Sequence, residues 1–148
     1  MIVSVAIIIF SALLFGYWFR YSCVLILRAR PTEDHSGAVI ETAGLRVLEV
    51  QTALNSSLSA DFDGLRASLE ADYRWVVRGL NAAAALPVDF TPIEKWMLEV
   101  DFQMMRAWYA LTRTLSKEQA RKALLEMSTI VTVFANSLGA IDEVESEA

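Results

Sequence analysis

The chain has 148 residues, 55% of them hydrophobic, and a formal net charge of −5. Three of its 13 basic residues and none of its 18 acidic residues lie in residues 1–30, so residues 31–148 carry a net charge of −8. This acidic part lacks the basic footprint of a nucleic-acid-binding protein and argues against broad electrostatic attachment to anionic lipid. It is long enough for one domain with a modest core.

The chain begins with an uncharged apolar run from Ile2 to Phe19. As a helix rising ~1.5 Å per residue, this run covers roughly 27 Å, close to the ~30 Å hydrocarbon core of a bilayer. We therefore predict a transmembrane anchor over residues 1–30. A cleaved signal peptide is the alternative interpretation, but no basic residue precedes the run, and bulky or charged residues follow it.

The basic residues that flank this run are all on its C-terminal side, namely Arg20, Arg28 and Arg30. Because positively charged flanks stay in the cytoplasm, we predict a single-pass protein whose body is cytoplasmic, with a bacterial inner membrane as the expected location. Trp18 and the three arginines are the predicted interface anchors, since amphipathic and snorkelling side chains favour the depth of the headgroups.

Two small residues in the anchor, Ala12 and Gly16, have the spacing that permits close packing between membrane helices. Small residues are also frequent in membrane helices without that role, so both interpretations stay open. Cys23 is the only cysteine, which leaves no intramolecular disulfide and suits a reducing compartment. Its position permits palmitoylation in a eukaryote, and a buried apolar thiol is the alternative.

Beyond the anchor, apolar spacing predicts four amphipathic helices in residues 31–141, followed by an acidic tail over 142–148. The first helix is expected to end near Ser57, and the second to open after Ser59 or Asp61. Their expected core faces are Val39, Ala43, Val47, Val50 and Leu54 in the first, and Phe62, Leu65, Leu69, Tyr73, Val76 and Leu80 in the second.

The third helix has the clearest start, because Thr91 is an N-cap, Pro92 fills the first helical position and Glu94 completes a capping box. Two apolar stripes follow, roughly 130° apart around the helix. We expect the first stripe to face the core, and the second either to be wedged against another helix or to form a docking groove for a partner helix or a second copy. The first stripe is Ile93, Met97, Val100, Met104, Trp108, Leu111 and Leu115, and the second is Leu98, Phe102, Met105 and Tyr109.

The fourth helix is predicted to begin at Ser116, where Gln119 repeats the capping-box pattern, and to end at Gly139. Its expected core face is Ala120, Leu124, Met127, Val131, Phe134 and Leu138.

Trp75 lies on the side of the second helix away from its apolar stripe, beside Arg74 and Arg78. A tryptophan between arginines, with small residues next to it, is typical of a docking patch for lipid headgroups or for protein. A tryptophan packed against the first helix, with the arginines on its edge, explains the pattern equally well.

The residue types that catalysis needs are scarce. His35 is the only histidine, which argues against a His-based metal site and a Ser-His-Asp triad. The chain has no Glu-x-x-His spacing, no phosphate-binding glycine loop and no dinucleotide fingerprint. We therefore expect no enzyme, no cofactor and no metal site.

These patterns predict an all-α protein with a single N-terminal transmembrane helix followed by an antiparallel bundle of about four helices. Apolar surface without catalytic residues favours a non-enzymatic accessory or scaffold subunit of a larger membrane protein assembly, with protein partners and no nucleic acid. Docking is expected through the second stripe of the third helix and through Arg74, Trp75 and Arg78. The alternatives are a helical module that binds a small apolar ligand or lipid, and a self-assembling membrane protein.

Overall fold

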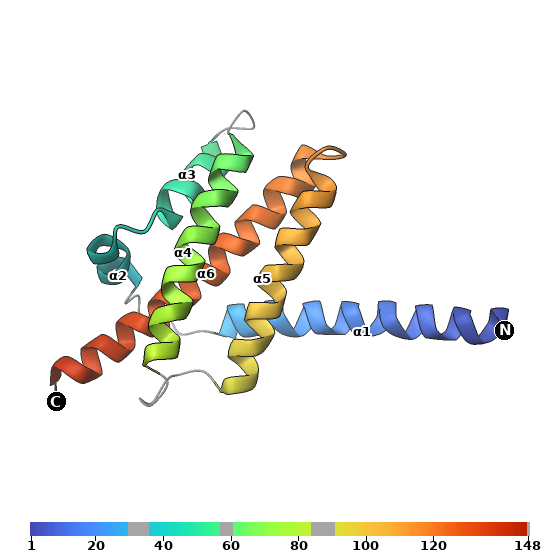
Figure 1. The fold of residues 1–148 in the computed structure, drawn as a ribbon, viewed down its shortest axis with the longest axis horizontal. Coiled ribbons are helices and arrows are strands. Elements are labelled where there is room, and N and C mark those ends of the chain that lie inside the picture. The colour runs from blue at the N-terminus through green and yellow to red at the C-terminus, as the bar shows by residue number, and fades with distance from the viewer. Residues whose placement is uncertain (30–35, 57–60, 84–90, 148) are drawn as a thin grey trace. The chain divides into compact units, whose positions relative to one another are not determined.

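The computed structural model describes residues 1–29, 36–56, 61–83 and 91–147, which contain six helices and no strand (Figure 1). The chain divides into two compact units, Met1–Pro31 and Thr32–Ala148. The first unit contains α1 (Ile2–Ala29). The second, called the body below, contains α2 (Ser36–Ala43), α3 (Val47–Ser56), α4 (Phe62–Ala82), α5 (Pro92–Thr112) and α6 (Lys117–Glu147). The predicted all-α class and N-terminal apolar helix are confirmed.

The first unit is one uninterrupted helix of 28 residues, α1, which continues past Arg20. At ~1.5 Å per residue it is about 42 Å long, and by length and composition it is able to cross a membrane. Trp18 and Arg28 are exposed, and a methyl group on Gly16 would meet no described atom within 4 Å. Arg30 lies outside the described residues.

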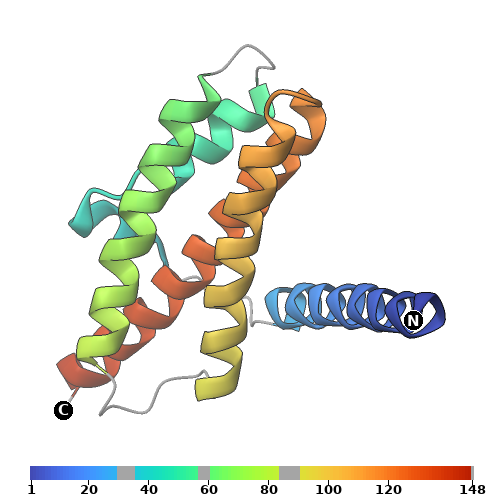
Figure 2. The same ribbon diagram turned by 45° about the vertical axis from the view of Figure 1, so that its right-hand side comes forward.

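α6 is the second helix in the described part of the chain that is long and apolar enough to cross a membrane. However, 61% of its most apolar stretch is buried inside the structure, as expected for the core helix of a soluble domain. α6 contacts α2, α3, α4 and α5, and Figure 2 shows the other helices of the body arranged around it. It is therefore the central helix of the body.

The burial along α6 explains both the success and the failure of its prediction. Ser116 caps its start by accepting a hydrogen bond from the Gln119 N–H, as expected. The predicted end at Gly139 is wrong, because α6 continues through Gly139 to Glu147, so the expected acidic tail is its last turn and a half. Packing around the buried Ile141 outweighs the low helix propensity of glycine. The predicted core face, Ala120, Leu124, Met127, Val131, Phe134 and Leu138, is buried throughout.

The helix expected to run to Ser57 is two helices, α2 and α3, which meet at Gly44. Gly44 has φ +65°, a left-handed conformation that glycine adopts without strain. The Gly44 N–H donates to the carbonyl of Glu41, and the Leu45 N–H donates to that of Ile40. These bonds satisfy carbonyls at the end of α2, as in other glycine-terminated helices.

A side chain from α4 fixes the start of α3. Asp72 is buried, and its Oδ2 accepts a hydrogen bond from the Arg46 N–H at 2.8 Å. Burial raises the pKa of Asp72, and hydrogen bonds from the backbone of Arg46 and Val47 partly oppose that shift. The break between α2 and α3 thus depends on a residue 26 positions away in the sequence.

The first stripe of α5 was expected to face the core, but Ile93, Trp108 and Leu111 are exposed, so that prediction is wrong. The second stripe is wedged against other helices, which is one of its two interpretations. The second stripe, Leu98, Phe102, Met105 and Tyr109, forms the inner face of α5, and each of its residues is at most 7% exposed. Phe102 stacks on Tyr73 of α4 with ring centroids 3.8 Å apart, and the Tyr109 hydroxyl donates to Asp63 of α4 at 3.0 Å. Because α4 and α6 both pack against this stripe, it belongs to the core and is not an accessible docking groove.

Candidate functional site

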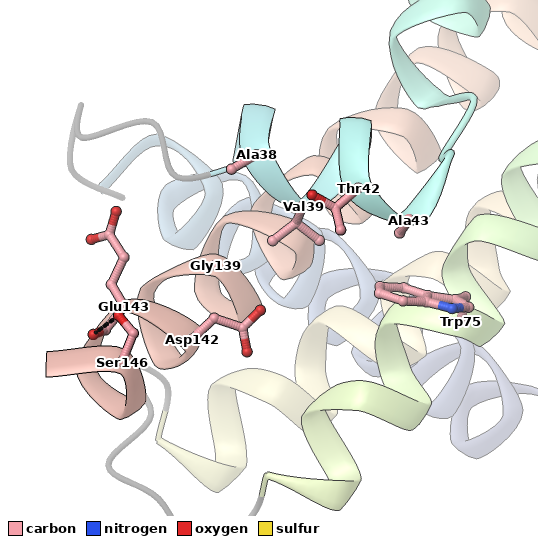
Figure 3. A pocket seen from close by; sticks show the side chains of 9 residues that line it. All are labelled: Ala38, Val39, Thr42, Ala43, Trp75, Gly139, Asp142, Glu143 and Ser146. Carbon is pink, nitrogen blue, oxygen red and sulfur yellow. Dashed lines mark hydrogen bonds between the residues drawn. The ribbon is translucent and has the colours of Figure 1, made fainter. Parts of the chain in front are cut away.

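A pocket of about 400 Å³ lies between α2, α4 and α6, at the end of the body where α6 terminates (Figure 3). The side chain of Trp75 borders it from α4, and Figure 3 shows the indole extending toward the space between α2 and α6. The other lining residues are Ala38, Val39, Thr42 and Ala43 from α2, and Gly139, Asp142, Glu143 and Ser146 from α6.

Small residues create this pocket. Ala38 and Ala43 on α2 and Gly139 on α6 leave space that larger side chains would fill. Gly79 allows α4 to lie close to α6, because a methyl group at that position would be 2.8 Å from Leu138 Cδ2. Trp75, one turn before Gly79, is thereby held beside α2.

Trp75 is 44% exposed, so one part of the indole is packed and the other is open to a ligand. Trp75 lies beside α2 without being covered by it, and its role as a docking residue stays a prediction. Arg74 and Arg78 are exposed but are not among the lining residues. Arg74 Nε donates to the Glu70 carbonyl at 3.2 Å. Of the predicted trio, only Trp75 belongs to the pocket.

The α6 side of the pocket is acidic. Asp142 and Glu143, called the acidic rim below, are followed by Glu145 and Glu147, and no basic residue lies in the last turn of the helix. The C-terminal end of a helix already carries partial negative charge, so these carboxylates add to a negative potential. The acidic rim was assigned to a tail by sequence, and the pocket forms only because α6 continues past Gly139.

The pocket has the chemistry of a binding site for a ligand with an apolar part and a positive charge. Tryptophan offers an apolar surface and attracts cations to its ring face, and carboxylates attract them by charge. The described lining residues include no histidine, cysteine or lysine, and the Ser146 hydroxyl donates to the Glu143 carbonyl at 2.9 Å. Among the described residues, no group of three or more His, Cys, Asp or Glu side chains could hold a metal ion.

A second, shallower hollow of about 470 Å³ lies beside α5, on the flank where Tyr73 of α4 borders it. Trp96, which the sequence analysis placed in neither stripe, is one of its lining residues. The large apolar residues on the side of α5 away from Phe102 are called the outer face of α5. They are Ile93, Trp96, Val100, Met104, Trp108 and Leu111.

The other predicted site residues lie apart from both hollows. Leu98, Phe102, Met105 and Tyr109 are in the core, and Ala12, Gly16, Trp18, Arg20 and Arg28 are on α1. Arg30 and His35 lie outside the described residues. The membrane roles of the α1 residues stay predictions.

Comparison of the chain with protein-family models, with curated proteins and with solved structures finds no match. The function is therefore inferred from the chemistry of the molecule itself.

Proposed function

We propose that the protein is a non-enzymatic accessory or scaffold subunit of a larger membrane protein assembly. In this proposal α1 is a single-pass anchor, and the body is an acidic antiparallel helical bundle on the cytoplasmic side of a bacterial inner membrane. The length and apolar composition of α1 support the anchor, and the basic residues that follow its apolar run support the orientation.

The observation that carries the proposal is the Trp75 pocket with its acidic rim. Cytoplasmic segments next to membrane spans carry an excess of lysine and arginine. Only residues 30–35 separate α1 from α2, and seven peptide units span at most about 25 Å. The body of an anchored chain therefore stays within reach of such basic segments.

The proposed occupant of the pocket is a basic, membrane-proximal segment of a partner protein. An apolar side chain of that segment would pack on the exposed part of the Trp75 indole. A lysine or arginine next to it would lie close to Asp142 and Glu143. Because the ring and the carboxylates recognise different parts of one segment, the pocket would select for a sequence that combines both.

Purification of the full-length protein from its native membranes in mild detergent, with mass spectrometry of bound proteins, tests this proposal. We expect a stoichiometric partner with the wild type and its loss with Trp75→Ala. Leu48→Ala is the matched control, because Leu48 is 48% exposed on α3 and does not line the pocket. A wild-type protein that purifies alone, or a partner that binds Trp75→Ala equally well, would overturn the proposal.

The size of the pocket supports a second function, binding of a small apolar ligand or lipid. Its volume of about 400 Å³ falls within the range of small-molecule sites, ~300–1,000 Å³. Native mass spectrometry of the purified protein would then show one bound small molecule per chain. Ala43→Trp, which fills the pocket from α2, should remove that molecule, whereas Leu48→Trp should not.

A further inference from the structure

The neighbouring helices α2 and α3 are held in the body to different degrees. α3 buries Val47, Val50 and Leu54, each of which is at most 1% exposed. α2 packs against α6 through Val39 and Ile40, and the other described residues of 37–42 are exposed. A helix of eight residues is not stable in water without packing. The position of α2 therefore depends largely on two buried side chains.

Hydrogen bonds to other helices also hold α3 but not α2. The Arg46 N–H, directly before α3, donates to Asp72 Oδ2 of α4 at 2.8 Å, and Gln51 Nε2 of α3 donates to Ser128 Oγ of α6 at 3.3 Å. Within the described part of the chain, no side chain of residues 37–43 forms a hydrogen bond or an ion pair. α3 is thus fixed to α4 and α6, whereas α2 is attached by packing alone.

The joint between the two helices has the properties of a hinge. Gly44 has φ +65°, and glycine exchanges between left-handed and right-handed backbone at little cost. A methyl group on Gly44 would meet no described atom within 4 Å, so the space around this residue is open. Asp72 fixes the chain at Arg46, two residues later. A rotation at Gly44 therefore moves α2 and leaves α3 in place.

The feature that α2 borders is the Trp75 pocket. The α2 wall of this pocket consists of Ala38, Val39, Thr42 and Ala43, and Figure 3 shows Val39 and Thr42 on the side of α2 that faces the pocket. Because these side chains are short, α2 has room to approach the indole of Trp75, which is 44% exposed. Burial of apolar ring surface favours this approach, and movement in the opposite direction widens the pocket.

We propose that α2 is a lid on the Trp75 pocket, which pivots at Gly44 to cover the indole or to expose it. The lid regulates the site of the proposed function, and it rests on that proposal for the nature of the occupant. Entry of a partner segment or of a small ligand then depends on displacement of α2. The motion itself needs no occupant, so it is tested on the purified protein alone.

Hydrogen exchange of the full-length protein in mild detergent tests whether α2 opens independently of α3. Relative to an unfolded chain, we expect the amides of residues 40–43 to exchange about tenfold faster than those of residues 51–54. Ile40→Ala should accelerate exchange in α2 by about tenfold or more, because it removes three buried carbon atoms and leaves the lining of the pocket unchanged. Leu48→Ala is the matched control on α3 and should leave α2 unchanged. Equal exchange of α2 and α3 in the wild type would overturn the proposal.

Acrylamide quenching of Trp75 fluorescence tests whether this motion opens the pocket. The other three tryptophans are first replaced by phenylalanine. Ile40→Ala should raise the quenching constant of Trp75, and so should Gly44→Ala, because alanine is strained at φ +65°. Gly44→Asn is the control, since asparagine tolerates the left-handed conformation, and it should quench like the wild type.

Faster exchange in α2 of Ile40→Ala without a change in Trp75 quenching would also overturn the proposal, because α2 would then be loosely attached without covering the pocket. Neither experiment contains a partner or a ligand. A failure of the lid is therefore distinguishable from a failure of the proposed function, which would appear as the absence of a bound partner.

Discussion

On its inner face α5 presents Leu98, Phe102, Met105 and Tyr109 to α4 and α6, whereas on its outer face residues such as Ile93 and Leu111 are exposed. Both faces consist of aliphatic, methionine and aromatic side chains at spacings of three and four. The difference between them lies in what they contact. Tyr73 stacks on Phe102, and Asp63 accepts the Tyr109 hydroxyl hydrogen bond, whereas Ile93 and Leu111 of the outer face are 65% and 60% exposed.

This contrast shows that apolar periodicity identifies a face that can be buried but not the element that buries it. The inner face is buried because α4 brings Tyr73 and Asp63 to it. The opposite face of the same helix is equally apolar, but Ile93, Trp108 and Leu111 on it are exposed. The four predictions below test this difference between the faces, from the largest expected effect to the smallest.

Phe102→Ala should destabilise the protein most. The substitution removes a ring that is 1% exposed and stacked on Tyr73, and deletions of this kind cost about 3–5 kcal/mol. Urea unfolding of the full-length protein in mild detergent, followed by circular dichroism, measures the change. Phe102→Leu keeps most of the volume and should lose less. A loss below about 1 kcal/mol for Phe102→Ala would mean that the inner face is not the core.

Alkaline pH should cause the second-largest loss of stability, because it deprotonates two buried tyrosines, Tyr109 on the inner face and Tyr73 packed against it. Burial raises the pKa of Tyr73 to about 12, and burial together with the hydrogen bond to Asp63 raises that of Tyr109 to about 12. An exposed tyrosine in the unfolded chain has a pKa of about 10, so the folded state holds these protons more tightly. The contribution of these two protonated hydroxyls to the stability of the fold is complete below about pH 10 and is lost as pH rises toward about 12.

Unfolding midpoints measured across this range, with ultraviolet absorbance of tyrosinate as a second signal, test the pH dependence. Tyr109→Phe removes one titrating hydroxyl and should make the alkaline loss shallower. If the midpoint stayed constant up to about pH 12, the two hydroxyls would be titrating as exposed groups, contrary to their burial.

Loss of the N-terminal cap of α5 should lower the free energy of unfolding to an intermediate degree, because this cap starts the helix that carries both faces. Thr91 Oγ1 accepts a hydrogen bond from the Glu94 N–H at 3.3 Å, and the Thr91 N–H donates to Glu94 Oε2 at 2.9 Å. Thr91→Ala removes the side-chain half of this capping box and should cost about 1 kcal/mol in urea unfolding. Thr91→Ser keeps the hydroxyl and is the control. Equal losses for the two variants would contradict a role for the cap.

Leu111→Ala should have the smallest effect on stability. Its side chain is 60% exposed on the outer face, and substitutions of such residues change stability by about 0.5 kcal/mol or less. The measurement is the same urea unfolding. A loss comparable to that of Phe102→Ala would show that the outer face is buried within a single chain, and the contrast between the faces would disappear.

Several elements could be predicted because their causes are local. The capping box at Thr91 and the cap at Asp61 start α5 and α4 at the expected residues. The core face of α6 was found by periodicity, since that helix is buried on the face where its apolar residues are concentrated. The end of α6 was missed, because Gly139 stops a helix only where no packing holds the following turn.

The candidate site was predictable only in part. Trp75 was recognised because a tryptophan away from the apolar stripe of its helix needs an explanation. Its pocket was not, since the acidic rim belongs to a turn that sequence assigned to a tail. Trp96 was missed because the predicted stripe passed from Ile93 through Met97 to Val100, although Trp96 satisfies the spacings of three and four equally well.

By itself the sequence determined the all-helical class, the apolar N-terminal helix, most helix starts and the core faces of α4 and α6. Caps, apolar runs and periodicity act within a few residues, so one chain is enough to reveal them. Only the tertiary structure decided the break at Gly44, the central position of α6, the Trp75 pocket and the buried face of α5. Each of these depends on residues far apart in the sequence, such as Asp72 at the start of α3 and Tyr73 on Phe102. Their free energy comes from contacts that exist only once the helices have packed.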